Sequence, residues 1–486
     1  MSANKNINLT MLCDFYELTM GNGYFENGMT DRITYFDIFY RQNPDNGGFA
    51  IAAGLEQAVE YVRDLHFDAD DIEYLRGRSL FSEAFLDYLA HFEFTGDIWA
   101  VPEGTPIFPR EPIMIVRAPA IQAQLLETYL LLTLNHQSLI ATKANRICRA
   151  AEGRVVLEFG SRRAQGADGA ITGARAAYIG GCAGTACTVS DSVYGVPAGG
   201  TMAHSWVQMF DDELTAFKTY CQIYPHNATL LIDTYDVMRG VENAIIVAHE
   251  MEGRGERLAG VRIDSGDLCA LSQRARARLD EAGLPYVKVI VSNDLDEHLV
   301  ESLLLQGARV DGFGIGTKLV TCFDQPALSG VYKLSAKRMP GQDWIPVIKV
   351  SEQVYKRTIP GVQDLRRYFD ESGAPVADMI CTVDYPHGVP ATIVDVNDPL
   401  LTRSLDGLRC ESMLHRFTQD GQRVAQPEDL SRARSRAAAN LASLKPASKR
   451  LLNPQVYPVG IEAGLSELRQ SMIAQARSIQ NDLTWR

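Results

Sequence analysis

Five short apolar runs decide the fold: RVVLEFG at 154–160, TLLIDTYD at 229–236, LAGVRIDSGD at 258–267, YVKVIVSND at 286–294 and VDGFGIGT at 310–317. In each run the apolar part is followed by an acidic residue, an asparagine or a glycine, as short buried strands often are. Segments with apolar residues three and four positions apart follow three of the runs, at 237–251, 266–283 and 294–307. This alternation predicts βα units and a mainly parallel sheet.

Polar residues or glycines stand where these runs end. Asp233, Asp264, Asn293 and Gly316 lie at or just after the carboxyl ends of their runs. They follow one another at steps of about 30 residues, as βα units require. Parallel α/β folds bind ligands at this end of the sheet. Because polar ends that converge on one mouth suit a barrel better than an open sheet, we expect an irregular TIM-like α/β barrel.

The regions on either side of the runs are less regular. RITYFDIFYR at 32–41 and KVSEQVYKRTI at 349–359 have the composition of strands, and residues 428–444 have the pattern of a helix. We expect the two flanks to pack together as a second α/β domain. The predicted N-terminal part, barrel and C-terminal part span residues 1–140, 141–345 and 346–486.

Composition argues against several classes of partner. The 486 residues carry a net charge of −13, so neither nucleic-acid backbone nor an anionic membrane would attract the surface. No apolar run approaches the roughly 20 residues that a spanning helix needs, and the N-terminus lacks the apolar core of a signal peptide. The nine cysteines are scattered without a CxxC pair, which indicates reduced thiols and a cytoplasmic protein.

The run Gly312–Lys318 places three glycines before a threonine and a lysine. Glycines let backbone N–H groups approach phosphate oxygens closely, and barrel phosphate sites often use late βα loops. Gly314, Gly316 and Thr317 are therefore candidate phosphate ligands. The alternative is a tight barrel turn, and the spacing is not that of a Walker A loop.

Arg262 and Asp264 lie two positions apart, so an alternating strand points both side chains to one side. The guanidinium suits a phosphate or a carboxylate, and the carboxylate suits ribose hydroxyls or Mg²⁺. The alternative is a structural ion pair. Residues 292–294, Ser-Asn-Asp, are either ligands or the N-cap of the next helix.

Three arginines follow the first run. Arg162, Arg163 and Arg175 stand near a strand end in an acidic chain, which favours an anion pocket over solvated surface charges. Phe159, beside them, either stacks on an aromatic ligand or belongs to the core.

His204 differs from the other histidines in its surroundings. It follows the pair Gly199-Gly200 and has hydroxyls nearby at Thr201 and Ser205. A lone histidine is usually structural. The alternative is a base, or a nucleophile that accepts a phosphoryl group.

Taken in order, eight segments resemble nicotinate phosphoribosyltransferase: CDFYELTM at 13–20, EFGSRRAQGADGA at 158–170, ARAAYIGGCAGTA at 174–186, GGTMAHSW at 199–206, VRIDSGDL at 261–268, VSNDLDE at 291–297, FGIGTK at 313–318 and GVYKL at 330–334. The combination is far more specific than any single motif, and it extends over nearly the whole chain. The resemblance implies an incomplete barrel, an α/β domain built from both ends of the chain, and a head-to-tail homodimer with shared active sites.

The resemblance also implies roles for individual residues. Tyr16 of one subunit and Phe159 of the other would sandwich the pyridine ring, with Thr201 close to nicotinate. His204 matches the family's phosphohistidine, which ATP phosphorylates. Asp264 would hold ribose hydroxyls or Mg²⁺, with Asp233 as a second candidate. The positions that match contacts around the phosphoribosyl group and its phosphates are Arg162, Arg262, Asp264, Asn293, Gly316 and Thr317. Arg162 is also a candidate contact of nicotinate.

The implied reaction joins nicotinate to the ribose carbon of phosphoribosyl pyrophosphate and hydrolyses ATP alongside. Its products are nicotinate mononucleotide, pyrophosphate, ADP and phosphate, and it is the first step of NAD synthesis from nicotinic acid. Ala186 follows Gly184-Thr185, where nicotinamide-using relatives carry an aspartate that would repel a carboxylate, so it favours the acid. The alternatives are a nicotinamide or quinolinate phosphoribosyltransferase and a non-catalytic sensor of phosphate ligands.

Overall fold

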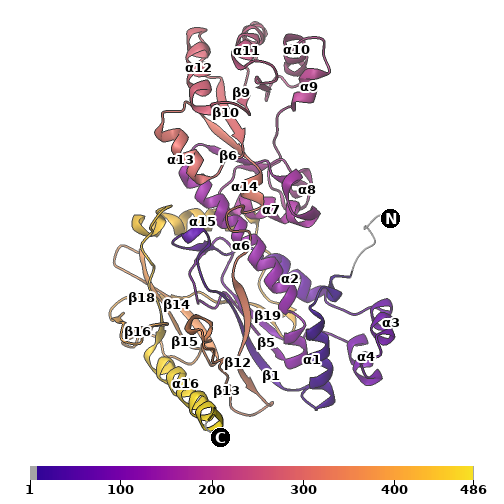
Figure 1. Ribbon diagram of the computed structural model, residues 1–486, viewed down its shortest axis with the longest axis vertical. Helices are drawn as coiled ribbons and strands as arrows, with labels where there is room; N and C mark the ends of the chain where they lie inside the picture. The colour runs from indigo at the N-terminus through magenta and orange to yellow at the C-terminus, as the bar shows by residue number, and fades with distance from the viewer. Residues whose placement is uncertain (1–7, 485–486) are drawn as a thin grey trace. The chain divides into compact units, whose positions relative to one another are not determined.

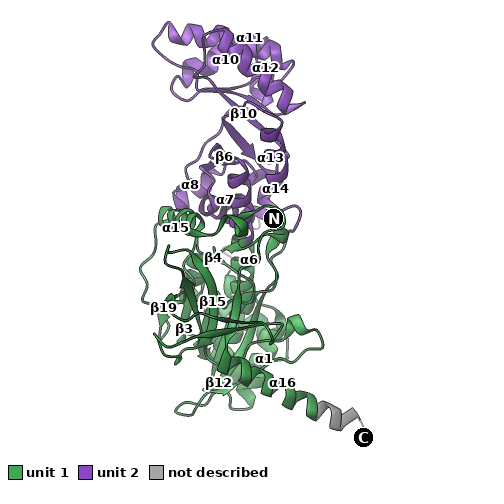
Figure 2. Cartoon of the chain, turned by 90° about the vertical axis from the view of Figure 1, so that its left-hand side faces the viewer, with its two compact units in different colours: residues 1–138, 327–486 green, residues 139–326 purple. Residues whose placement is uncertain are grey.

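The computed structural model describes residues 8–484, with side chains up to residue 478. The chain divides into two compact units (Figure 2). Unit 1 comprises Met1–Ser138 and Ala327–Arg486, and unit 2 comprises Leu139–Pro326.

Unit 2 contains an open parallel sheet of six described strands in the order β7-β6-β11-β10-β9-β8. Strands β6, β9 and β10 of this sheet are labelled in Figure 1. All five predicted runs form strands in it, and β7 is an additional short strand at one edge. Because β7 and β8 lie at opposite edges of the sheet order, the predicted incomplete barrel is confirmed as a half-barrel. The strands are β6 Val155–Glu158, β7 Gly184–Thr185, β8 Thr229–Leu231, β9 Gly260–Ile263, β10 Lys288–Asn293 and β11 Gly312–Ile315.

An aspartate begins each helix that follows β8, β9 and β10. The carboxylates of Asp236, Asp267 and Asp296 accept the backbone N–H three residues further on, at 2.8, 3.0 and 2.8 Å. Such caps satisfy N–H groups that a helix leaves open at its start. The helices of unit 2 are α7 Gly166–Gly180, α8 Thr188–Tyr194, α9 His204–Gln208, α10 Glu213–Ile223, α11 Val237–Glu252, α12 Leu268–Glu281, α13 Glu297–Leu305 and α14 Thr317–Val320, with the 3₁₀ turn η3 at Ser161–Arg163.

Unit 1 contains two larger sheets. Among the described residues, one has seven strands in the order β13-β12-β1-β5-β3-β19-β20, all antiparallel. Its strands are β1 Ile33–Tyr40, β3 Asp97–Ala100, β5 Met114–Pro119, β12 Gly330–Arg338, β13 Ile345–Pro346, β19 His415–Gln419 and β20 Gln422–Arg423. N-terminal β1 pairs with β12, and β3 pairs with C-terminal β19, so both flanks of the chain build one sheet, as predicted.

The second sheet of unit 1 has the order β17-β16-β21-β15-β14-β18 in the described part of the chain. Its strands are β14 Gln363–Phe369, β15 Pro375–Thr382, β16 Thr392–Asp395, β17 Thr402–Ser404, β18 Arg409–Ser412 and β21 Val459–Glu462, and a small separate sheet pairs β2 Ala50–Ile51 with β4 Pro106–Ile107. The buried Tyr35 hydroxyl of β1 donates to the carbonyl of Gln363 in β14 at 3.1 Å, which joins the two larger sheets.

Helices complete unit 1, and the predicted helix at 428–444 is confirmed as α15. The helices are α1 Phe15–Glu26, α2 Leu55–Asp64, α3 Ala69–Gly77, α4 Glu83–Ala90, α5 Ala120–Gln124, α15 Leu430–Ser443 and α16 Ala463–Thr484, with the 3₁₀ turns η1 Leu9–Met11, η2 Pro44–Asn46, η4 Val354–Lys356 and η5 Pro446–Lys449. Helix α6, Glu127–Ala150, begins in unit 1 and ends in unit 2. None of the described helices is long and apolar enough to cross a membrane.

Two details differ from expectation. The predicted strand at 349–359 is wrong, because this segment contains only η4. Val350 and Val354 would share one strand face, but Glu352 lies between them on that face and Ile359 falls on the opposite face, so the segment has no continuous apolar strand face. The segment after residue 326 also belongs to unit 1 through the pairing of β12 with β1, whereas the predicted barrel extended to residue 345.

Candidate functional site

Arg262, Asp264 and Ser292 meet at the carboxyl ends of β9 and β10, as the strand pattern predicted for the first two. Arg262 Nη1 donates to Ser292 Oγ at 3.2 Å and lies 3.6 Å from Asp264 Oδ1. The Ser292 hydroxyl donates to the same Asp264 oxygen. The three side chains therefore form one hydrogen-bonded group, in which both contacts of Asp264 fall on Oδ1.

Asp233 adds a second carboxylate to this group from the segment after β8. Its Oδ2 accepts the backbone N–H of Asp264 at 3.0 Å and the hydroxyl of Ser265 at 2.6 Å. Its other oxygen, Oδ1, is buried and has no hydrogen-bond partner among the described residues. Asp233 therefore fixes the turn after β9 through Oδ2, and its Oδ1 is available to bind a ligand.

Arg262 is a largely buried cation with unused hydrogen-bonding capacity. Its side chain is 13% exposed, and its Nε is buried without a partner in the described part of the chain. Burial lowers the pKa of Arg262, the charges of Asp264 and Asp233 oppose this, and the charge of Arg162 adds to the lowering. Because a guanidinium stays protonated in proteins, this arginine remains a cation that an anion would stabilise.

The loop that carries Thr201 and His204 is attached to Arg262. Arg262 Nη2 donates to the carbonyl of Met202 at 2.8 Å, and the Thr201 hydroxyl lies 3.3 Å from the same carbonyl. Half-buried His204 begins α9, and its Nδ1 is 3.1 Å from the hydroxyl of Thr234, which follows β8. We call Asp233, Arg262, Asp264 and Ser292 the strand-end group. His204 lies next to this group, because its partner Thr234 directly follows Asp233.

Phe159 follows β6, and Gly314 makes room for it. The Phe159 N–H donates to the carbonyl of Ile315 at 2.8 Å. A Cβ at Gly314 would lie 2.5 Å from two carbons of the Phe159 ring, and one at Gly316 would lie 3.0 Å from the Phe159 carbonyl. Gly314 is therefore required by the close approach of the Phe159 ring, and a side chain at position 316 would need the Phe159 carbonyl to give by a few tenths of an ångström. Thr317, half-buried, begins α14 directly after them.

Asn293 has strained backbone at the end of β10. Its φ of 149° lies in a region that side chains rarely adopt, and its Oδ1 accepts the N–H of Asp294 at 2.7 Å. The alternative interpretation of residues 292–294 as a helix cap is wrong, because Asp296 caps α13. Strain of this kind concentrates at functional sites.

The three candidate arginines have different surroundings. Arg162 and Arg163 are exposed in η3, directly after the Phe159 turn. Arg175 is buried within α7, and its guanidinium carbon lies 5.7 Å from the centre of the Tyr194 ring. The expected anion pocket therefore has two exposed candidates, and Arg175 packs inside the fold.

Ala186 is exposed directly after β7, and its N–H donates to the carbonyl of Glu158 at 2.8 Å. Two neighbours that the sequence did not single out, Glu158 and Thr185, are buried and bonded to each other at 2.5 Å. Tyr16, by contrast, belongs to unit 1, where it is 43% exposed on α1. Within one chain, Tyr16 and Phe159 therefore come from different units.

Mg²⁺ is compatible with the carboxylates of this site. No group of three or more histidine, cysteine or acidic residues suited to a metal occurs in the described part of the chain. Mg²⁺ in phosphate-handling enzymes is usually held by one or two carboxylates together with substrate phosphates. Asp233, with its unpartnered Oδ1, and Asp264 match that smaller requirement.

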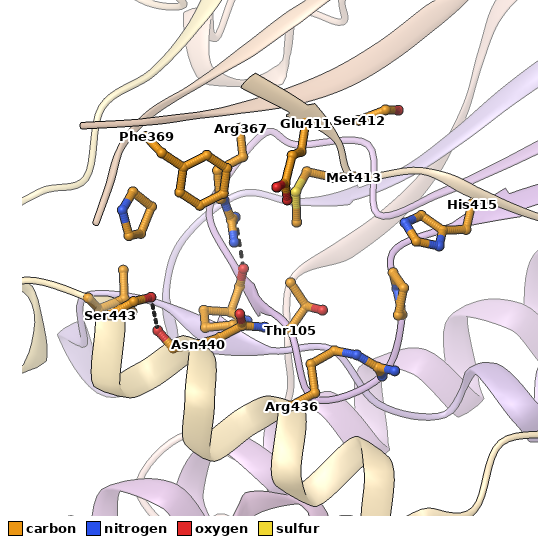
Figure 3. Close-up of a pocket in the computed structure, with 14 residues that line it drawn as sticks. Thr105, Arg367, Phe369, Glu411, Ser412, Met413, His415, Arg436, Asn440 and Ser443 are labelled. Carbon is orange, nitrogen blue, oxygen red and sulfur yellow. Dashed lines mark hydrogen bonds between the residues drawn. The ribbon is translucent and has the colours of Figure 1, made fainter. Parts of the chain in front are cut away.

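Two cavities lie elsewhere in the molecule. One of about 720 Å³ is found at the amino ends of β6, β10 and β11 in unit 2. The other, of about 260 Å³ in unit 1, lies between β14 and α15 (Figure 3). Its two arginines are already paired, Arg367 with Asp378 and Arg436 with Glu428. Neither cavity is lined by a predicted site residue, so the strand-end group is defined by its polar contacts instead.

Three family models match most of the chain. Residues 11–135 match the nicotinate phosphoribosyltransferase N-terminal domain, residues 155–370 match the family's own model, and residues 363–469 match its C-terminal domain. A nicotinate phosphoribosyltransferase of Bacillus subtilis is 37% identical over 489 residues, which cover 98% of this chain and 97% of the relative. The chain belongs to the nicotinate phosphoribosyltransferase family.

Other members of the family agree with this assignment. A nicotinate phosphoribosyltransferase of Mycobacterium tuberculosis is 44% identical over 356 residues, which cover 72% of this chain and 76% of the relative. The crystal structure of the human nicotinic acid phosphoribosyltransferase superposes with a TM-score of 0.81 at 29% identity, covering 94% of this chain and 99% of that one. The half-barrel and the domain built from both chain ends are thus the architecture of a nicotinate phosphoribosyltransferase.

Proposed function

We propose that this chain transfers the phosphoribosyl group of phosphoribosyl pyrophosphate to the ring nitrogen of nicotinate, giving nicotinate mononucleotide and pyrophosphate. The observation that carries the proposal is the strand-end group, in which half-buried Arg262 and Asp233 each keep a buried, unpartnered polar atom beside Asp264. Family membership supports the same reaction. The Bacillus subtilis relative, which aligns with 98% of this chain, is named a nicotinate phosphoribosyltransferase.

The chemistry needs positioning and charge neutralisation more than a protein nucleophile. As pyrophosphate leaves, the ribose carbon develops positive charge and the departing oxygens become more negative. Arg262 neutralises phosphate oxygens, and Asp264 accepts from ribose hydroxyls. Asp233 and Asp264 would hold Mg²⁺, which supplies further charge neutralisation when bound. Around the phosphoribosyl group lie Arg162, Asn293, Gly314, Gly316 and Thr317.

The pyridine ring is oriented by stacking. Phe159 provides one face, and Tyr16 of a second subunit provides the other in a homodimer with shared active sites. Thr201 lies close to the substrate's ring. A methyl group at Ala186 leaves the nicotinate carboxylate unopposed, whereas an aspartate there would repel it.

His204 is proposed to couple the reaction to ATP. Its Nδ1 is engaged with the Thr234 hydroxyl, which leaves Nε2 to attack the γ-phosphorus of ATP. ADP leaves, the imidazole loses its proton, and water later releases phosphate from the phosphohistidine. This turnover draws nucleotide formation toward product. We place the reaction in the cytoplasm, where the nine free thiols would stay reduced.

Product analysis tests the reaction. The protein is incubated with phosphoribosyl pyrophosphate, Mg²⁺ and nicotinate, nicotinamide or quinolinate, with and without ATP. We expect nicotinate mononucleotide and pyrophosphate, in larger amount when ATP is present. Preferred use of nicotinamide or quinolinate contradicts the substrate assignment, and binding without pyrophosphate release identifies a sensor.

Phosphoryl labelling tests His204 separately. With γ-labelled ATP, we expect an acid-labile, base-stable label on the wild-type protein that His204→Ala lacks. His226→Ala is the matched control, because His226 is exposed in a loop outside the strand-end group. A label that persists in His204→Ala rules out this histidine as the phosphoryl carrier.

A further inference from the structure

Glu158 is a buried carboxylate at the carboxyl end of β6, with both oxygens occupied. It is 1% exposed. Its Oε1 accepts the N–H of Gly160, and its Oε2 accepts the hydroxyl of Thr185 at 2.5 Å. Burial raises the pKa of Glu158, and these two hydrogen bonds oppose the rise. No ion pair of Glu158 occurs within the described residues, so two hydrogen bonds alone compensate its burial.

Thr185 extends this contact to two further segments. The residue is fully buried in β7, and its hydroxyl oxygen accepts the N–H of Cys187 at 2.9 Å. Its backbone N–H donates to Pro197 at 3.0 Å, and its carbonyl accepts the N–H of Gly199 at 2.8 Å. Thr185 therefore joins the turn after β6, the turn after β7 and the loop that leads to His204.

The chemistry of this pair allows few replacements. The Thr185 hydroxyl donates to Glu158 Oε2, and its oxygen accepts from the N–H of Cys187. The Gly160 N–H is also an obligate donor, so Glu158 must accept twice on two different oxygens. A glutamine has one acceptor oxygen and would leave one buried donor unsatisfied.

The three joined segments carry residues that surround the pyridine in the proposed reaction. Phe159 lies between Glu158 and Gly160, Ala186 lies between Thr185 and Cys187, and Thr201 follows Gly199 by two positions. We infer that Glu158 and Thr185 are positioning residues that fix Phe159 and Ala186 for the pyridine substrate. They set affinity and selectivity for that substrate, and the phosphoribosyl pyrophosphate site depends on Arg262 instead. This inference rests on the proposed function.

Steady-state kinetics of Thr185→Val, Thr185→Ser and Glu158→Gln test it. For Thr185→Val we expect the KM for nicotinate to rise about tenfold, the effect of one buried group left without its partner. The KM for phosphoribosyl pyrophosphate should stay within about twofold of wild type, since Arg262 is untouched. Thr185→Ser keeps the hydroxyl and should restore most of the nicotinate affinity.

Selectivity and coupling give two further readouts. The preference for nicotinate over nicotinamide should fall in Thr185→Val and in Glu158→Gln. The double variant should lose less than the product of the two single losses, because both remove the same interaction. Thr172→Val is the matched control, since its hydroxyl bonds only within α7, to the Asp168 carbonyl at 2.7 Å.

The outcomes separate the two ideas. A wild-type protein that forms no mononucleotide defeats the proposed function before any variant is measured. An active wild type whose variants raise both KM values equally, or in which Thr185→Ser is as impaired as Thr185→Val, overturns the positioning role alone. If Glu158→Gln does not fold, the two Thr185 variants decide the question.

Discussion

Each unit of the chain contains a buried arginine beside carboxylates, and the two arginines are treated differently. In unit 1, Arg367 of β14 is 4% exposed and donates three hydrogen bonds to Asp378 and one to the carbonyl of Pro106. Asp378 also accepts from the Tyr457 hydroxyl at 2.8 Å. In unit 2, no carboxylate satisfies Arg262 in this way. Its Nε is buried and has no hydrogen-bond partner among the described residues.

Buried polar atoms without hydrogen-bond partners occur in both units, and their chemistry differs. Unit 1 also has carboxylate oxygens without partners, such as Oδ1 of Asp37 and Oε1 of Glu111. Burial raises the pKa of both residues, so they can avoid charge by keeping a proton. Arg262 cannot do so. An unpartnered atom alone identifies no ligand, because Nε is also buried without a partner among the described residues in Arg41, Arg276, Arg338 and Arg416. The site in unit 2 is distinguished because an unpartnered guanidinium nitrogen of Arg262 and an unpartnered carboxylate oxygen of Asp233 both lie beside Asp264. This combination points to an anionic ligand.

The largest expected effect is on stability and lies in unit 1. Asp378→Asn removes the charge that Arg367 needs, and we expect a loss of about 3–5 kcal/mol, as for other broken buried pairs. Urea unfolding measures it. Glu411→Gln is the control, because the neighbouring pair Arg409–Glu411 is more than half exposed and should contribute little. If Asp378→Asn lowers the free energy of unfolding as little as the control does, the Arg367–Asp378 pair does not stabilise unit 1.

The next effect is on activity and lies in unit 2. Arg262→Lys keeps the charge but not the geometry that contacts Ser292 and Met202, so kcat/KM should fall about 100-fold. The melting temperature should change little, because the arginine is incompletely paired. Arg278→Lys is the control, since Arg278 pairs with Glu242 on the surface. If Arg262→Lys loses stability as strongly as Asp378→Asn while keeping activity, the comparison between the units fails.

The third effect is a pH dependence. Burial raises the pKa of Asp37 to about 7, above its value in the unfolded chain. The folded protein therefore holds the extra proton between about pH 4 and pH 7, and the contribution of Asp37 to stability falls as pH rises through that window. Asp37→Asn removes this dependence. Relative to wild type, the variant should gain about 2 kcal/mol between pH 5 and pH 8, measured by urea unfolding at both values. A constant difference would show that Asp37 is already ionised at pH 5.

Much of the architecture could be predicted because its signals are local. Three of the four strand-end residues are followed three positions later by a capping aspartate, as in Asp233 and Asp236 or Asp264 and Asp267. The same spacing from Asn293 leads to Asp296, and applying it there would have identified the cap that residues 292–294 do not provide. Local periodicity thus located five of the six described strands of the half-barrel, the helices α11, α12 and α13, and the strand ends where the polar residues gather.

Features that depend on strand order could not be predicted. Glu158 and Thr185 are 27 residues apart and meet only because β6 and β7 are neighbours in the sheet. The transfer of β12 to unit 1 likewise depends on its pairing with β1. The need for glycine at position 314 also depends on a distant segment, because a side chain there would collide with the Phe159 ring. Contacts between distant segments leave no periodic mark on either segment.

The smallest expected effect concerns Asn293, where strain and function oppose each other. Its φ of 149° is costly for a residue with a side chain, and glycine adopts it freely. Asn293→Gly should therefore raise stability by up to about 1 kcal/mol after the entropic cost of glycine. Because Asn293 is proposed to contact the phosphoribosyl group, the KM for phosphoribosyl pyrophosphate should rise while that for nicotinate stays constant. A variant that gains stability without losing affinity would mean that the strain serves the turn before α13 and not the substrate.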